Sequence, residues 1–372
     1  METTLTKVTV PTVVLRDLVS RAAKCSTNVD MIPLSSLMQI VVKDGKMYVR
    51  TTDNINFVTT FSDVTADNFD IMVQTKLFSQ LVSKITSENT TFTIEGNKLT
   101  VLGNGRHNVA LMTDTDGSVI KFPVVEVTPV GTTYHLKSEE VRSILSLNKS
   151  CKSEKNEIPA HACNYYADSN RVLTTNYYKA CSNPIKLSDH PIMISSTVMD
   201  LVSSVMDEEG VDVYQDAEYI VFESTKGKLV GKKVSEEELS ELPAEKLIEK
   251  IETELAYSVT MNRTLFVQAV DRMCLFVDTY EQNRLTLTFT ANGLNLYSNK
   301  TDSSEELNYV SVITPITSDV RFSVDAQFLK SELSACDRED LTIRFSDDTG
   351  LQIHCGDVAL ILGRLNETEE IG

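Results

Sequence analysis

A sixfold internal repeat runs through the sequence and limits the folds that are open to it. Short segments with helical spacing recur, each with apolar residues at i, i+3 and i+4, and their central residues lie 57 to 68 residues apart. These central residues are Leu18, Leu81, Ile144, Leu201, Ala269 and Glu332. Repeats with a mean length of 62 residues cover all 372 residues. A fixed period of this size indicates one supersecondary unit that is used six times.

Each repeat begins with a short strand-like segment that precedes its helix. The six segments are Lys7–Val10, Phe69–Val73, Thr133–Leu136, Ile192–Ser195, Tyr257–Thr260 and Arg321–Val324. Alternating segments follow the helix and are joined by turn residues, such as Asp44-Gly45, which tolerate positive φ. Each repeat is therefore predicted to fold as β-α-β-β-β, and the whole chain as an α+β protein with mostly antiparallel sheets.

Six repeats with one helix each can pair into three domains, because two repeats close a helix layer over a common sheet face. We expect three similar domains at residues 1–127, 128–252 and 253–372, the last with a short acidic C-terminal tail. The joins are expected near Val124–Pro129 and Glu245–Glu254. The polar run Ser235–Glu241, before the second join, is interpreted as a solvated helix or a linker.

The composition is acidic, with a formal net charge of −18. This charge argues against a nucleic-acid binder, because attraction to phosphates needs positive charge. The acidity is uneven, however: the three thirds carry net charges of −1, −7 and −10, which leaves room for local positive surfaces. Seven cysteines without a CxxC pair favour a reduced, cytoplasmic protein. No signal-peptide core or membrane-spanning run is found, so we expect no membrane association.

No catalytic constellation emerges from the motifs, and we expect no enzyme activity, metal or cofactor. Asp348-Thr349-Gly350 matches an aspartic-protease triplet in letters but is explained by a hairpin turn. The five histidines are scattered, without an i, i+4 pair for a metal. An acidic α+β hydrolase remains an alternative and predicts perturbed titratable groups gathered in one cleft. A structural shell protein is a third class, which would also use repeats.

Basic residues recur in the helical segments and in the loops after them. Because the apolar stripe of each helix packs on a sheet, these cations are expected on the opposite, solvated face. The candidates are Arg16, Arg21, Lys24, Lys76, Lys84, Lys137, Arg142, Lys149, Lys152, Arg263, Arg272, Arg284 and Lys330. An ordinary solvated surface explains any single helix, but the repetition over six helices favours a shared function.

Several local sequences resemble the bacterial-type DNA sliding clamp family, the beta subunit of DNA polymerase III. The sequences that carry the resemblance are Ile32–Leu37, Val41–Lys46, Thr51–Asp53, Lys121–Pro123, Thr174–Asn176, Leu242-Pro243 with Leu247, and Leu360–Leu365. Each is short, and their order and spacing agree with the six repeats. Departures from the family pattern suggest a distant member, and a viral source is one interpretation.

The resemblance implies a ring. Two subunits of three domains each would close head to tail as a homodimer, with helices lining the hole and sheets outside. Such a clamp encircles double-stranded DNA without reading its sequence, tethers the DNA polymerase and is opened by a clamp loader. Since screening limits exposed charges to about 8–10 Å, cations on the inner helices would govern the hole despite the acidic exterior. A clamp-like subunit of a heteromeric ring is the alternative within this fold.

The resemblance also implies two protein-binding sites. The first is a pocket for short apolar peptides from the polymerase and loader, formed by Ala180, Pro243, Leu247, Leu360, Ile361 and Leu362. Burial in the core is an equally weighted interpretation of Leu360 and Leu362. The second is the subunit contact, with Val109 and Leu111 on an edge strand against Phe276 and Val277. Ala180 stands where the family has leucine, and the acidic tail after Leu365 is suspected to tune access to the pocket.

Overall fold

The computed structural model describes residues 6–27, 33–114, 117–118, 120–153, 160–298, 300–347 and 350–366. The chain forms two compact bodies. The first body consists of Met1–Glu139 and Thr197–Lys233, and the second of Glu140–Ser196 and Val234–Gly372. Each body is described by itself below.

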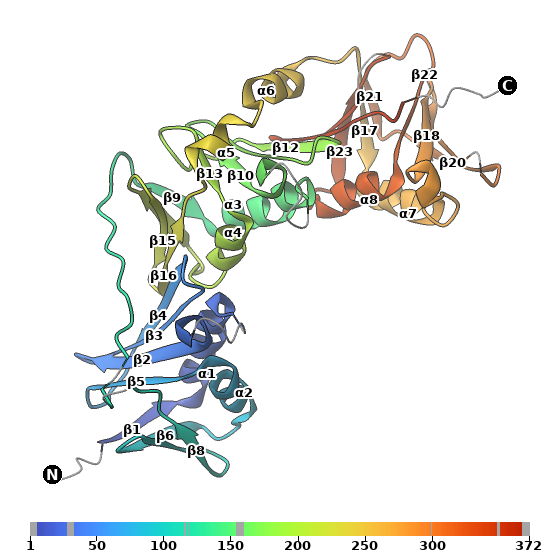
Figure 1. The fold of residues 1–372 in the computed structure, drawn as a ribbon. Helices are drawn as coiled ribbons and strands as arrows, with labels where there is room; N and C mark the ends of the chain where they lie inside the picture. The colour runs from blue at the N-terminus through green and yellow to red at the C-terminus, as the bar shows by residue number, and fades with distance from the viewer. Residues whose placement is uncertain are drawn as a thin grey trace. The chain divides into compact units, whose positions relative to one another are not determined.

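Repeats 1 and 2 lie in the first body and follow the predicted order of elements (Figure 1). Repeat 1 consists of β1 (Thr6–Pro11), α1 (Thr12–Ala22), β2 (Leu37–Lys43), β3 (Lys46–Thr52) and β4 (Phe57–Asp63). Repeat 2 consists of β5 (Phe69–Gln74), α2 (Thr75–Lys84), β6 (Asn89–Glu95), β7 (Lys98–Leu102) and β8 (Arg106–Ala110). Two short 3-10 turns follow α1, namely η1 (Ala23–Cys25) and η2 (Pro33–Ser36).

Repeats 3 and 4 also have the predicted order, but their strands are divided between the bodies. Repeat 3 consists of β9 (Tyr134–Lys137), α3 (Ser138–Ser143), the π-helical turn η3 (Ile144–Asn148), η4 (Ala160–Cys163), β10 (Tyr165–Ala167), β11 (Val172–Thr175) and β12 (Lys179–Asn183). Repeat 4 consists of β13 (Ile192–Ile194), α4 (Ser196–Val202), β14 (Gly210–Gln215), β15 (Tyr219–Ser224) and β16 (Gly227–Lys232). Strands β9 and β14–β16 lie in the first body, and β10–β13 in the second.

Repeats 5 and 6 lie in the second body. Repeat 5 consists of β17 (Tyr257–Asn262), α7 (Arg263–Met273), η5 (Thr279–Glu281), β18 (Arg284–Phe289), β19 (Gly293–Ser298) and β20 (Ser303–Asn308), followed by an additional strand, β21 (Ser311–Thr314). Repeat 6 consists of β22 (Val320–Asp325), α8 (Ala326–Ala335), β23 (Asp340–Phe345), β24 (Leu351–Cys355) and β25 (Val358–Leu362). The α+β fold class and the β-α-β-β-β pattern of the repeats are thus confirmed.

Two further helices occupy the expected second join. The polar run forms α5 (Glu236–Ser240), whose N-terminus is capped by the Ser235 side chain accepting a hydrogen bond from the Glu238 N–H. Helix α6 (Ala244–Glu252) follows and covers nearly the whole segment that was expected to be a join. The polar run is therefore a solvated helix, one of its two predicted interpretations.

Strand pairing continues across the expected domain joins. The first body has a four-stranded sheet, β1-β6-β7-β8, and an eight-stranded sheet, β5-β2-β3-β4-β16-β15-β14-β9. The second body has a nine-stranded sheet, β13-β10-β11-β12-β25-β24-β23-β17-β21, and a four-stranded sheet, β20-β19-β18-β22. The β4–β16 and β12–β25 pairs each join strands from different expected domains. The division into three domains therefore remains a prediction.

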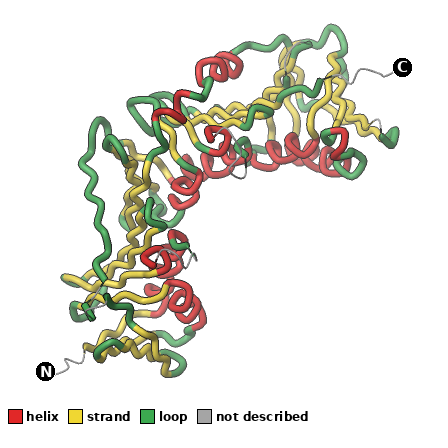
Figure 2. Tube along the Cα trace, in the orientation of Figure 1, coloured by secondary structure: helices red, strands yellow, loops and turns green. Residues whose placement is uncertain are grey.

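The helices cover the sheets through the apolar residues that define the repeat. In α1, Leu15, Leu18 and Val19 are fully buried, because the i, i+3, i+4 spacing puts them on one face. Figure 2 shows, within the second body, α3, α8 and α7 on one side of the strands and α6 on the other. Strand alternation makes the two sheet faces available to different helices.

The helix of repeat 6 has a buried acid where most other repeats have an aliphatic residue. Glu332 is fully buried, and one of its carboxyl oxygens accepts a hydrogen bond from the Cys151 thiol at 3.5 Å. Burial raises the pKa of Glu332 well above its ordinary value, and the nearby Cys151 adds to this while Lys179 opposes it. A protonated carboxyl avoids the cost of a buried charge, so the repeat tolerates this residue.

Candidate functional site

The first body exposes three lysines of the predicted helical set. Lys24 lies in η1, and Lys76 and Lys84 lie near the two ends of α2, all with exposed side chains. The Lys24 ammonium donates a hydrogen bond to the Ser203 hydroxyl at 3.4 Å. These side chains can reach an anion in solvent without breaking an ion pair, because none of them has one among the described residues.

The two arginines of α1 are engaged with the protein itself. Arg21 forms an ion pair with Asp17 at 2.8 Å and donates to the carbonyls of Ser204 and Lys226, and its side chain is only 11% exposed. Arg16 donates to the carbonyl of Ile85. Arg21 therefore holds α1 against the turn after α4 and the turn between β15 and β16, and its prediction as a phosphate contact is corrected on this ground.

The predicted cations of repeat 3 are mostly on the surface. Lys137 ends β9 in the first body, while Arg142 and Lys149 lie on α3 and just after η3 in the second, and all three are exposed. Lys152 is half-buried and its ammonium donates to the carbonyl of Ser153 at 3.3 Å. Arg142 and Lys149 are thus the cations that this helical segment presents to solvent.

The predicted cations of the last third are largely neutralised by neighbouring acids or held by the chain. Arg272 makes two hydrogen bonds to Glu305, at 2.8 and 2.7 Å, and Lys330 forms a 2.5 Å ion pair with Asp271. Arg284 lies on β18 rather than on a helix and donates to the carbonyl of Asn366 at 2.8 Å. Arg263, the first residue of α7, is half-buried. The four cations predicted for this third are therefore poorly placed to meet a phosphate, and their assignment to DNA binding remains a prediction.

The second body has a pocket of about 350 Å³ beside α6. Three of the six predicted pocket residues line it, namely Ala180, Leu247 and Ile361. Strand pairing explains the first and last of these, because β12 and β25 place Ala180 directly opposite Ile361. Helix α6 adds Leu247 above them. The volume is within the range of small-molecule and peptide-anchor pockets, roughly 300–1,000 Å³.

The other three predicted pocket residues are corrected. Leu360 and Leu362 are 0% and 1% exposed and belong to the hydrophobic core of the second body. They alternate with Ile361 along β25, so they face the side of the sheet opposite the pocket. Pro243 is exposed and precedes the first residue of α6, and it is outside the pocket lining.

Several pocket residues were missed by the sequence analysis. They are Thr175, Tyr177, Tyr178, Lys179, Lys250, Thr253, Leu255, Gly350, Gln352, Gly363 and Arg364. Tyr177 and Tyr178 lie in the turn before β12, where Tyr177 has a φ of 71° and the two residues are 56% and 63% exposed. The signal available in the sequence is the pair of adjacent tyrosines directly after Thr174–Asn176, since tyrosine is enriched at binding surfaces.

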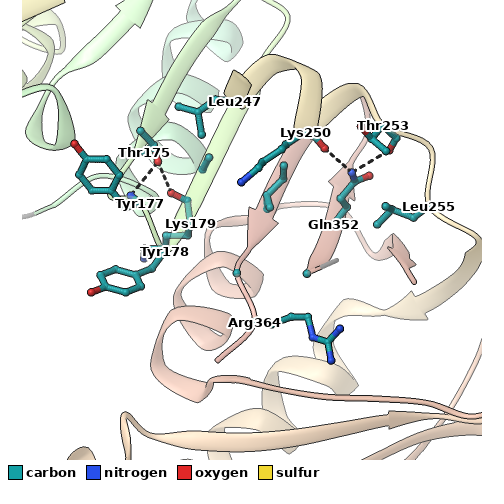
Figure 3. Close-up of a pocket in the computed structure, with 14 residues that line it drawn as sticks. Thr175, Tyr177, Tyr178, Lys179, Leu247, Lys250, Thr253, Leu255, Gln352 and Arg364 are labelled. Atoms are coloured by element: carbon teal, nitrogen blue, oxygen red, sulfur yellow. Dashed lines mark hydrogen bonds between the residues drawn. The ribbon is translucent and has the colours of Figure 1, made fainter. Parts of the chain in front are cut away.

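Gln352 fixes the position of α6 over the pocket (Figure 3). Its side chain is almost fully buried, and its amide group donates to the carbonyls of Lys250 and Thr253 at 3.2 Å each. These carbonyls lie at the C-terminal end of α6, where backbone acceptors lack intrahelical partners. The contact therefore sets where the pocket residues of α6 stand relative to β24 and β25.

The two halves of the predicted subunit contact lie in different bodies: Val109 and Leu111 in the first, and Phe276 and Val277 in the second. Strand β8 is an end strand of its sheet, as expected, but Val109 is 3% exposed and faces the core of the first body. Leu111 is half-buried just after β8. Val109 is therefore corrected from a contact residue to a core residue, since it pairs with the buried Leu99.

In the second body, the predicted contact residues lie in the segment after α7. Phe276 is 37% exposed, and Val277 is half-buried against the core. Leu275, at 79%, and Tyr280, at 96%, are more exposed still and were not predicted. This segment is therefore apolar and accessible within its body.

Among the described residues, the groups with strongly raised pKa values are not gathered in a cleft. Groups with strongly raised pKa values, such as Glu332, Cys181 and Cys336, are buried in the core of the second body rather than in a cleft. Within the described residues, no group of three or more His, Cys, Asp or Glu side chains could hold a metal. The Asp348-Thr349 part of the protease-like triplet lies outside the described residues. Of the helices that are described, none is long and apolar enough to cross a membrane.

Comparison with solved structures identifies the fold as that of a DNA sliding clamp along the whole chain. The beta subunit of DNA polymerase III from Thermotoga maritima matches with a TM-score of 0.81 and 17% identity, over 98% of this chain and 100% of that one. A sliding clamp from Pseudomonas aeruginosa, bound to griselimycin, gives 0.83 and 14%, over 97% and 100%. The beta subunit from Streptococcus pyogenes gives 0.82 and 16%, over 97% and 100%.

A family model defines the first part of the chain more closely. Residues 6–118 match the model described as DNA polymerase III beta subunit, N-terminal domain. The comparison with curated protein sequences gives no match. Residues 6–118 are thus similar to the N-terminal domain of DNA polymerase III beta subunits, and the chain has the sliding-clamp fold over 97–98% of its length; the low identities fit a divergent sequence, as the sequence analysis expected.

Proposed function

We propose that this chain is a DNA sliding clamp, a processivity factor that encircles duplex DNA and tethers a replicative DNA polymerase. The observation that carries the proposal is the clamp fold over 97–98% of the chain, together with the beta-subunit domain at residues 6–118. The role is topological rather than catalytic, and needs no cofactor. It places the protein in a cytoplasm, bacterial or that of an infected host cell.

The DNA-facing surface of the proposed clamp consists of exposed helix cations. The best supported are Lys24, Lys76, Lys84, Arg142 and Lys149, because each is exposed. Phosphate contacts of this kind bind a duplex independently of its base sequence, and a clamp that slides along DNA requires such non-specific contacts. Retention would come from the closed ring, so a small number of cations is sufficient.

The pocket beside α6 would bind peptide segments of the polymerase and of a clamp loader. Its apolar lining by Ala180, Leu247, Leu255 and Ile361 supports this role. The two bodies would contribute three similar domains, as the sequence predicts. The acidic tail that follows Asn366 would limit access to the pocket; residues 367–372 are outside the described part of the chain.

Ring closure would join the β8 edge of one subunit to the segment after α7 of a second copy. An end strand needs a partner or protection, and the apolar side chains of Leu275 and Phe276 offer a surface that excludes water. A clamp-like subunit of a heteromeric ring is the alternative, and it predicts that the chain alone does not close.

Light-scattering mass, combined with negative-stain electron microscopy of the same sample, tests this proposal. We expect a particle of twice 41.4 kDa with a central hole. Replacement Phe276→Asp should convert it to a monomer at micromolar concentration, because a charge would be buried in the contact. Val312→Asp is the matched control, since Val312 is similarly exposed, at 42%, on β21. A wild-type monomer under all conditions would contradict the homodimer.

A further inference from the structure

The pocket beside α6 is unusual in its charge. Its lining contains Lys179, Lys250 and Arg364, and none of the described residues that line it is Asp or Glu. This occurs in a chain with 53 acidic and 35 basic residues. The cleft of about 330 Å³ in the first body has a mixed lining instead, with Asp17 and Asp63 beside its cations. The pocket lining is therefore basic, while Glu249 and Glu252 on α6, and Glu241, which adds to burial in raising the pKa of Tyr177, lie outside it.

Lys250 is the cation best placed to meet a ligand. Its residue is exposed, and its ammonium has no ion pair or hydrogen bond among the described residues. Figure 3 shows its side chain extending from α6 toward the side of the pocket where Thr175 and Lys179 lie. Because Gln352 binds its carbonyl at 3.2 Å, the backbone that carries this ammonium is fixed.

The other two cations are held in place by the protein. The Lys179 ammonium donates to the Ser331 hydroxyl at 2.9 Å and lies 4.7 Å from the centre of the Phe328 ring. The Arg364 guanidinium donates to the carbonyl of Asp347 and lies 5.2 Å from the centre of the Phe322 ring. Lys179 pairs with Leu362, so its side chain faces the side of the sheet opposite the pocket, where it interacts with the buried Glu332. Lys250 and Arg364 are therefore the cations that add positive potential at the pocket.

The pocket also has an apolar surface, which would bind apolar side chains of a ligand. Ala180, Leu247, Leu255 and Ile361 offer carbon surface, and the lining also includes Tyr177 and Tyr178 at the turn before β12. An occupant that matches both parts carries apolar side chains and a carboxylate a few atoms away. A nucleic acid would match the cations but would leave this apolar surface without a partner.

We propose that this pocket selects peptide segments in which an acidic side chain lies next to apolar anchor residues, and that Lys250 binds the carboxylate. This proposal rests on the proposed function, which makes the pocket a peptide site. It adds the chemistry of the partner: an acidic–apolar segment instead of a purely apolar one. Charge-assisted hydrogen bonds of this kind are stronger than neutral ones and fix the register of the peptide.

Selection of displayed random heptapeptides on the full chain tests the proposal. Wild-type protein should enrich peptides with Asp or Glu beside apolar residues. The Lys250→Glu variant should lose this preference for acids, whereas Lys246→Glu should keep it. Lys246 is the matched control because it is an exposed lysine on the same helix and outside the pocket lining.

The best wild-type peptide is then made with Asn or Gln in place of its acid, and binding is measured by fluorescence anisotropy. We expect wild-type protein to bind the neutral peptide about tenfold more weakly than the acidic peptide. The Lys250→Glu variant should bind the neutral peptide at least as tightly as the acidic peptide.

Equal binding of both peptides to wild type would overturn the acidic preference but would not contradict a peptide pocket. Selected peptides that are indifferent to Ile361→Asp would instead contradict the pocket itself, and with it the partner site of the proposed function. Displacement of the peptide by a labelled DNA duplex would overturn the assignment to peptides.

Discussion

Replacing Gly210 by alanine is expected to lower the free energy of unfolding of the first body by about 3–5 kcal/mol. Gly210 opens β14 opposite Lys137 of β9, with a φ of 135° that side chains rarely adopt. A Cβ atom at this position would lie 1.8 Å from the carbonyl oxygen of Leu136, so β9 and β14 could not keep their spacing. Urea unfolding followed by circular dichroism measures the effect.

Gly96→Ala is the matched control for this change. Gly96 also has a positive φ, of 55°, but an added Cβ meets no atom within 4 Å. Its cost should be limited to the left-handed conformation, about 1–2 kcal/mol. The β9–β14 pairing joins the first strand of repeat 3 to repeat 4. This pairing would be contradicted if the two substitutions destabilised the protein equally, or if Gly210→Ala had no effect.

Replacing Lys24, Lys76 and Lys84 together by alanine is expected to weaken binding to duplex DNA at every sequence. Each lost phosphate contact should make the slope of log affinity against log salt less steep by about 0.9, and therefore by up to about 2.7 for the three. The side chains are exposed and their loss leaves the core intact, so folding should not change. Fluorescence anisotropy with a labelled duplex, at several salt concentrations, measures the slope.

Lys43, Lys98 and Lys121, also replaced by alanine, provide the control with the same change of net charge. All three are exposed in the first body but lie on strands or in a loop rather than on helices. Their loss should leave the slope close to that of the wild type. If both triple variants change the slope equally, the helices have no special role in DNA binding, and only the overall charge of the protein matters.

Much of the fold could be predicted from the sequence because each repeat is a local pattern. The six predicted first strands agree with the observed ones within two residues, a helix follows each of them, and Asp44-Gly45 forms the expected turn with φ values of 52° and 76°. The β4–β16 and β12–β25 pairs were not predicted, because a partner from a distant repeat leaves no local signal. These pairs decide which repeats share a sheet.

The candidate sites were harder to predict, because they depend on where side chains point and what they meet. Val109 and Leu362 have the right residue type for a contact, but strand alternation turns both into the core. Arg272 and Lys330 look like free cations until folding brings Glu305 and Asp271 to them. Lys250 escaped notice because its importance comes from the other residues of the pocket lining, which come from distant parts of the sequence and include no Asp or Glu.

Retention on circular DNA tests the central claim, that this chain encloses a duplex, most directly. The protein is diluted until its subunits separate, mixed with nicked circular plasmid or with the same plasmid made linear, concentrated again, and passed through a sizing column at high salt. Enclosure predicts that the protein elutes with the circular plasmid and not with the linear one, because high salt screens the phosphate contacts and leaves only topology. Loss from both forms, or equal retention on both, would contradict a closed ring around DNA.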